Sequence, residues 1–208
     1  MSLPVLLLIE GFAYVVIFGG LSLLRREGLS LRFAIEATLI TLAVSGLTAL
    51  SGYPTHPALF LFLVYLLTMR VRLLVDVGNS FAQRQQYNRA EVFYNLAGRL
   101  WPDPTGKNII LLNQAVMLFQ RGATDEAIAA LTGILQKSSE GFLGLRHEAA
   151  AHYNLGAAYR RKGLEAQAIR EFNAVIDTWP ASEYARNAAA ALEKRRQKDT
   201  PAPVEKEK

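Results

Sequence analysis

Two histidines in the C-terminal half come closest to a known catalytic pattern. The run His147-Glu148-Ala149-Ala150-Ala151-His152 places a glutamate beside two potential zinc ligands. A helical metalloprotease motif needs its histidines four residues apart, because both rings must lie on one helix face. Here the spacing is five, which turns the rings about 140° apart at about 100° per residue. The sequence therefore predicts no zinc site at these two positions.

Other catalytic patterns are also missing from the sequence. The chain has no Cys, which excludes disulfides, thiolate chemistry and Cys-ligated metals. It has no phosphate-binding glycine loop with a lysine, no nucleophile elbow and no paired carboxylates in a soluble segment. Ser45-Gly46 alone does not suggest an intramembrane protease. The net charge of +5 is spread among mixed signs, which argues against nucleic-acid binding. We expect no enzymatic activity and no cofactor.

Three apolar stretches occupy residues 1–75, at about 3–24, 33–52 and 56–75. The first would measure about 33 Å as a helix, enough to cross a hydrocarbon core of about 30 Å. It has no basic residues before it and no evident cleavage site, which favours a retained transmembrane helix over a signal peptide. We predict a three-helix membrane domain, with a buried soluble helix as the alternative for the third stretch.

Arginines fall on one side of the three predicted spans. The first loop carries Arg25, Arg26 and Arg32, the second loop carries no Lys or Arg, and Arg70 and Arg72 follow the third span. Short cytoplasmic loops are rich in Lys and Arg. The pattern therefore predicts an N-terminus outside and a C-terminal domain in the cytoplasm, at an inner membrane of bacterial type. We expect Arg70 and Arg72 to reach toward lipid headgroups.

Small or weakly polar side chains recur every four residues along the second span, at Ala37, Thr41, Ser45 and Ala49. Such a stripe allows close approach of helix backbones. Its partner is another span of the same chain or a second subunit.

Two glutamates lie within the predicted spans, where ionisable side chains are candidates for function. For Glu36 we expect a salt bridge to Arg32, one helical turn away. Glu10 lies roughly 10 Å inside the first span. Protonation, pairing across helices and contact with a partner are the alternatives for its carboxyl group.

Beyond Arg70 the sequence repeats with a period near 34 residues. Three segments align at Ala90, Ala127 and Ala168. Twelve residues before each alanine stands a small residue, and four residues after it a bulky one; these are Gly78, Ala115 and Gly156, and Tyr94, Leu131 and Phe172. The pattern indicates pairs of helices that cross closely at the small residues. No Pro or Gly separates the third span from the first repeat, so one continuous helix is expected there.

In the third segment the run HYNLGAAYRRKG covers His152 to Gly163, and the stretch Ala168 to Pro180 follows it. This segment closely resembles the tetratricopeptide repeat (TPR) family, and the second segment does so least, because Ile134 replaces a small residue. The resemblance implies an all-α fold, with three transmembrane helices followed by a TPR-type α-solenoid. Its parts would be repeats at about 71–104, 108–141 and 149–182, a capping helix at 182–197 and a disordered tail at 198–208.

In TPR proteins the first helix of each repeat lines a concave groove that binds peptides or partner helices. By this resemblance the groove residues are Asn79, Gln83, Leu112, Asn113, Val116, Phe119, Gln120, Tyr153, Asn154, Ala157, Arg160 and Arg161. Phe119 and Tyr153 would be anchors, although Phe119 would serve equally for packing between repeats. Arg160 and Arg161 would favour an acidic segment or form a solvated face. The clamp that some TPR domains use for a C-terminal carboxylate is not expected, because Val75, Ala150 and Asn154 stand at its basic positions.

The sequence therefore predicts a membrane-anchored scaffold or adaptor that binds another protein through a cytoplasmic groove. The alternative is a small accessory or assembly subunit of a larger membrane complex, or a homo-oligomer, with its main contacts made by the transmembrane helices.

Overall fold

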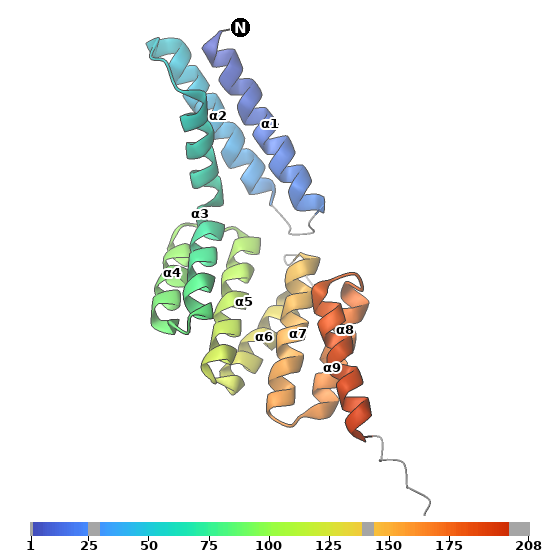
Figure 1. The fold of residues 1–208 in the computed structure, drawn as a ribbon. Coiled ribbons are helices and arrows are strands. Elements are labelled where there is room, and N and C mark those ends of the chain that lie inside the picture. The colour runs from blue at the N-terminus through green and yellow to red at the C-terminus, as the bar shows by residue number, and fades with distance from the viewer. Residues whose placement is uncertain (1, 25–29, 139–143, 200–208) are drawn as a thin grey trace, which may run out of the picture.

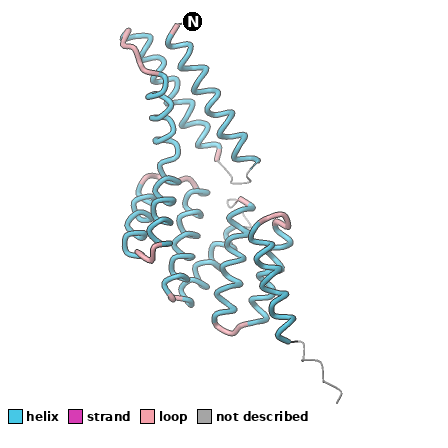
Figure 2. Tube along the Cα trace, in the orientation of Figure 1, coloured by secondary structure: helices cyan, strands magenta, loops and turns pink. Residues whose placement is uncertain are grey.

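The computed structural model describes residues 2–24, 30–138 and 144–199. Within these ranges the regular structure is entirely α-helical (Figures 1 and 2). The helices are α1 (Leu3–Leu24), α2 (Leu31–Ser51), α3 (Pro57–Gln83), α4 (Tyr87–Arg99), α5 (Pro104–Arg121), α6 (Thr124–Ser138), α7 (Leu145–Arg161), α8 (Glu165–Thr178) and α9 (Glu183–Asp199). The fold agrees with the predicted all-α class. The predicted disordered tail lies outside the described residues from 200 onward.

Helices α1, α2 and the first half of α3 form a bundle at one end of the molecule (Figure 1). Its core contains Leu7, Tyr14, Phe33, Ala37, Phe60, Val64 and Met69. All three helices are long and apolar enough to cross a membrane. Large apolar side chains such as Phe12, Leu39 and Phe62 are exposed on the outer surface of the bundle.

Small side chains bring α1 and α2 together. A side chain at Gly11 of α1 would collide with Thr41 of α2, and the Ser45 hydroxyl donates a 2.8 Å hydrogen bond to the Pro4 carbonyl oxygen. Ala37, Thr41 and Ser45 are buried, but Ala49 is exposed and Thr48 is buried in its place. A strict four-residue spacing drifts by about 40° per step, which leaves Ala49 about 120° from Ala37, whereas Thr48 lies only about 20° away.

Helix α3 links the bundle to the rest of the chain without a break. It begins with Pro57 in its first turn, where a missing N–H costs nothing, and runs to Gln83. The prediction of one continuous helix is confirmed. The bundle and the first helix pair therefore share a single rigid element.

The remaining helices pack as consecutive pairs, α3 with α4, α5 with α6 and α7 with α8, with α9 against α8 (Figures 1 and 2). A Cβ atom at Gly78 would lie 2.5 Å from the Tyr94 ring, and one at Gly156 would lie 2.9 Å from the Phe172 ring. The predicted close crossings occur at these glycines, because each aromatic ring of the second helix lies directly over the backbone of the first. Replacing Gly78 or Gly156 by any larger residue would force these rings outward.

Candidate functional site

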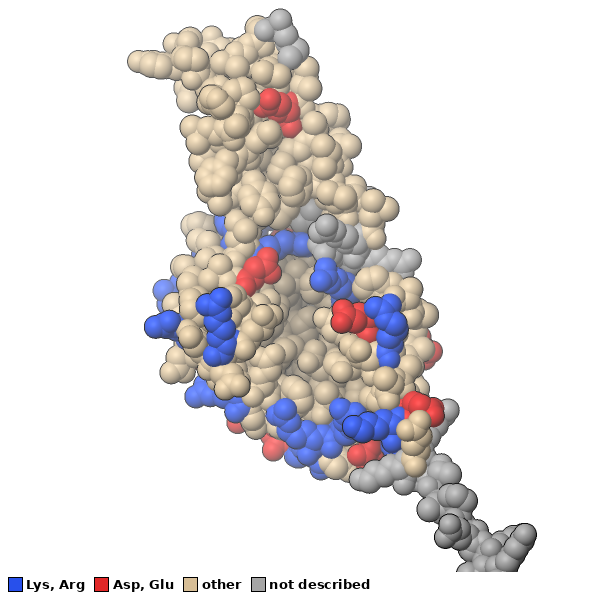
Figure 3. Space-filling model, viewed as in Figure 1, with Lys and Arg blue, Asp and Glu red and all other residues tan. Residues whose placement is uncertain are grey.

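A cavity of about 550 Å³ lies where the bundle meets the helix pairs. Its walls come from the end of α1 and from α3, α5, α7 and α9. Figure 3 shows this face as a hollow with charged side chains around it, below a bundle that carries few charges. The cavity is large enough for a segment of another chain, and most of its lining belongs to the first helix of each pair.

Three asparagines line the cavity, one from each of α3, α5 and α7. The side-chain amides of Asn113 and Asn154 donate to carbonyl oxygens one turn earlier, at 2.7 and 2.8 Å. The Oδ1 atom of Asn79 accepts a 2.7 Å hydrogen bond from the Tyr94 hydroxyl. These bonds orient the amides and leave Oδ1 of Asn113 and Asn154 and Nδ2 of Asn79 for a ligand. The row can therefore hydrogen-bond both donors and acceptors of a polypeptide.

Burial supports the hydrogen bond between Tyr94 and Asn79. Removal of the Tyr94 side chain from water raises its pKa to about 12, because the phenolate is the form that burial disfavours. The hydroxyl thus stays protonated at neutral pH and remains a donor to Asn79. Burial also raises the pKa of Tyr184, which reaches the cavity from α9.

The end of the cavity nearest the bundle is apolar. Phe18 and Leu21 of α1 and Tyr65 and Met69 of α3 line it. Side chains of both charge signs lie farther along the lining, including Arg72, Asp76 and Arg146. Apolar side chains such as Leu112 and Val116 lie between the asparagines. A ligand that fits this cavity is therefore amphipathic, with an apolar part toward the bundle and both polar and apolar groups along the asparagines.

Five of the groove residues predicted from the sequence line the cavity: Asn79, Leu112, Asn113, Val116 and Asn154. The others lie outside its lining: Gln83, Phe119, Gln120, Tyr153, Ala157, Arg160 and Arg161. Phe18 and Leu21 had no signal in the repeat alignment because α1 precedes the repeats, and Tyr65 and Met69 had none because they lie in the part of α3 before the first repeat.

Phe119 packs between helix pairs rather than standing free. The Arg161 guanidinium lies 3.8 Å from the centre of its ring, and Arg161 Nη1 donates a 2.6 Å hydrogen bond to the Phe119 carbonyl oxygen. This stacking ties α5 to α7. Tyr153 packs likewise against the rings of Phe172 and Tyr184, at 5.9 and 5.8 Å. Both aromatic side chains are partly exposed, and their role as binding anchors stays a prediction.

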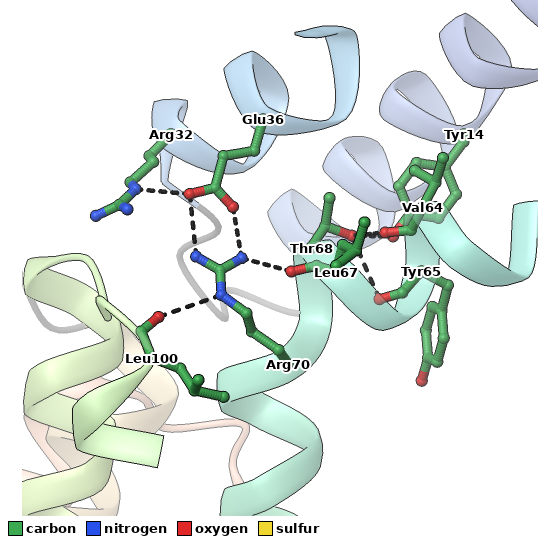
Figure 4. A network of polar contacts seen from close by, with 9 residues as sticks. All are labelled: Tyr14, Arg32, Glu36, Val64, Tyr65, Leu67, Thr68, Arg70 and Leu100. Atoms are coloured by element: carbon green, nitrogen blue, oxygen red, sulfur yellow. Dashed lines mark hydrogen bonds and ion pairs between the residues drawn. The ribbon is translucent and has the colours of Figure 1, made fainter. Parts of the chain in front are cut away.

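Arg70 joins three elements at the base of the bundle (Figure 4). Its Nη1 and Nη2 atoms contact the Glu36 carboxylate of α2 at 2.6 and 3.1 Å, and its Nε donates to the Leu100 carbonyl oxygen at 3.2 Å. Arg32 also contacts Glu36, at 2.8 Å, so the predicted salt bridge is confirmed. The contact of Arg70 with Glu36 was not predicted, and it gives the guanidinium two charge-assisted hydrogen bonds within the protein. The reach of Arg70 and Arg72 toward lipid headgroups stays a prediction.

Glu10 has one carboxylate oxygen, Oε2, that is buried and has no hydrogen-bond partner among the described residues. Its environment leaves the three alternatives for this carboxyl group in place. His152 contacts Glu171 through Nδ1 at 2.7 Å, which ties α7 to α8. Over residues 2–24, 30–138 and 144–199, no group of three or more His, Asp or Glu side chains is placed to hold a metal ion.

Comparison with known proteins identifies the helix pair α7 and α8. The tetratricopeptide repeat family matches residues 150–182. This pair is a tetratricopeptide repeat. The TPR match includes both Gly156 and Phe172, whose contact sets the crossing of the two helices, and the same contact recurs between Gly78 and Tyr94 in the pair formed by α3 and α4.

One solved structure similar to this TPR-containing chain is the N-terminal domain of stress-induced protein-1 (STI-1) from C. elegans. It is 18% identical, with a TM-score of 0.47, and the alignment covers 60% of this chain and 95% of that one. No curated protein matches the chain.

Proposed function

We propose that this protein is a membrane-anchored TPR adaptor without enzymatic activity. In this proposal α1, α2 and the first half of α3 cross the bilayer, and the cavity between the bundle and the helix pairs binds a segment of another protein. The main support for this proposal is that one cavity is lined both by Phe18 and Leu21 of α1 and by the asparagines of the repeats.

The position of the cavity favours a partner that is itself at the membrane. An apolar end beside the bundle and a mixed polar and apolar wall along the repeats match a segment that leaves a bilayer and enters water. Anchoring also raises the effective concentration of a membrane-bound partner near the cavity. A soluble peptide would contact only the part of the cavity that the repeats line.

We place the N-terminus outside and the TPR domain in the cytoplasm at an inner membrane, on the arginine distribution. The natural chain has no Cys, so single cysteines can be introduced at Thr55 and at Lys107. We expect an impermeant maleimide added to intact cells to label Thr55→Cys and to leave Lys107→Cys unlabelled. The reverse labelling would show that the orientation is wrong.

Photocrosslinking tests the binding cavity. A photoreactive amino acid at Val116, which lines the cavity, should give a discrete protein adduct in native membranes. The same group at Leu111, exposed on the same helix but outside the lining, is the matched control and should give none. Asn113→Arg in the Val116 background should weaken the adduct, because the longer cation occupies part of the cavity and removes one asparagine of the row.

Equal adducts at both positions would contradict a specific cavity. The absence of adducts, together with a stable stoichiometric complex on native electrophoresis in a gentle detergent, would favour the accessory-subunit function instead. The large apolar side chains exposed on the outer surface of the bundle, such as Phe12 and Phe62, are the observation that supports this second function, since helices of a partner could pack against them.

A further inference from the structure

Among the described residues of the helix pairs and their links, Trp101 has the most exposed aromatic side chain. It lies in the short link between α4 and α5 and is 77% exposed, whereas its neighbour Pro102 is buried. Its backbone has a φ of +49°, in the left-handed region where glycine is favoured. A large apolar ring thus stands in solvent at a position where a small residue would cost less.

The link that carries Trp101 abuts the base of the bundle. A shallow cleft of about 60 Å³ is lined by Trp101 and Asp103 of the link, Arg32 of the first turn of α2, and Arg70. Arg70 also holds the link directly, through its hydrogen bond to the Leu100 carbonyl oxygen. The ring is therefore fixed at the level of the first turn of α2 rather than at the far end of the repeats.

That level corresponds to the edge of a bilayer. Helix α2 has 21 residues, which at 1.5 Å each measure about 32 Å and match a hydrocarbon core of about 30 Å. Its first turn would then lie among the headgroups. The exposed Leu31 and the half-exposed Arg32 begin this turn. Tryptophan favours this layer, because its ring is apolar and its indole N–H needs a polar partner.

We propose that Trp101 inserts into the lipid headgroup layer and docks the α4–α5 link on the bilayer surface. Arg32 and Arg70 share the one carboxylate of Glu36 in the same cleft, so these three side chains keep a net positive charge that favours lipid phosphates. The repeats are then held to the membrane at two places, along α3 and at Trp101. This inference rests on the proposed membrane insertion of α1 to α3.

Fluorescence quenching tests the proposal cleanly, because the chain has only two tryptophans. The second, Trp179, is half-buried in the core formed by α7, α8 and α9. The full chain would be reconstituted as Trp179→Phe and as Trp101→Phe, in phosphatidylcholine vesicles whose acyl chains carry bromine near the headgroups. We expect bromine to quench the emission of Trp101 roughly twofold more than the emission of Trp179. We also expect the emission maximum of Trp101 to lie at a shorter wavelength than that of indole in water.

Flotation with the vesicles and helical circular dichroism provide the controls. If Trp179→Phe does not fold, the emission of Trp101 is obtained as the difference between the emission of the wild type and that of Trp101→Phe. The second variant is expected to fold, because Trp101 is exposed and its replacement leaves the core intact. Vesicle-bound protein whose Trp101 is quenched no more than Trp179 would overturn the docking of the link alone. Failure to float would overturn the membrane insertion on which the proposed function also depends.

Discussion

Replacing Phe172 by alanine is expected to lower the free energy of unfolding of the TPR domain by about 3–5 kcal/mol. The Phe172 side chain is 2% exposed and lies over Gly156, with the Tyr153 ring beside it. Its loss opens a cavity at the crossing of α7 and α8 that the surrounding helices can fill only in part. Phe172 is the largest of the buried side chains in α7 and α8.

Urea unfolding of the full chain in detergent, followed by circular dichroism and by Trp179 emission, measures this effect. Trp179 belongs to the same core cluster as Phe172, so it reports the loss of that core. The matched control is Val92→Ala, an exposed position on α4 at 63%, for which a change within about 0.5 kcal/mol is expected. Similar losses for the two variants would show that the Phe172 contact does not hold the pair together.

Arg70→Ala is expected to lower stability by about 2–3 kcal/mol, because it removes hydrogen bonds between charged groups. The Glu36 carboxylate would keep only Arg32, and the Leu100 carbonyl oxygen would lose its donor. Arg70→Lys should lower the free energy of unfolding by a smaller amount, because lysine keeps the positive charge. Some loss is still expected, because lysine lacks the planar fork that contacts both carboxylate oxygens.

A double-mutant cycle with Glu36→Gln isolates the interaction between Glu36 and Arg70 from the other contacts of each side chain. Thermal unfolding in detergent provides the readout, and Arg170→Ala, an exposed position on α8, provides the control. Additive losses in the cycle would mean that the ion pair makes no contribution of its own.

Much of the helical framework could be predicted from local sequence. The spacing of Gly78 before Tyr94, and of Gly156 before Phe172, predicts close helix crossings because both partners lie within one helix pair. The continuity of α3 follows from the absence of Pro and Gly between its apolar half and its first repeat. These features depend on residues that are close together in the sequence, and the spacing of small and apolar residues reveals such local contacts directly.

The candidate site depends on contacts that periodicity does not report. Glu36 and Arg70 lie 34 residues apart on different helices, and sequence alone favoured the nearer Arg32. The apolar end of the cavity comes from α1 and from the first half of α3, whose residues carry no repeat pattern. Phe119 was a candidate anchor because its position lies on the groove face, but Arg161 from the next repeat covers its ring.

Because α3 is unbroken, a change in its tilt at one end moves the residues at its other end. Its 27 residues measure about 40 Å at 1.5 Å per residue. If α3 crosses the bilayer as proposed, a mismatch between its apolar part and the bilayer thickness would favour a change of tilt, within the limits set by its packing against α1 and α2. A tilt of about 10° around its outer end would displace Gln83 by roughly 7 Å. The orientation of the asparagine row would then follow the thickness of the surrounding membrane, unless the contact of the α4–α5 link with the lipid surface opposes it.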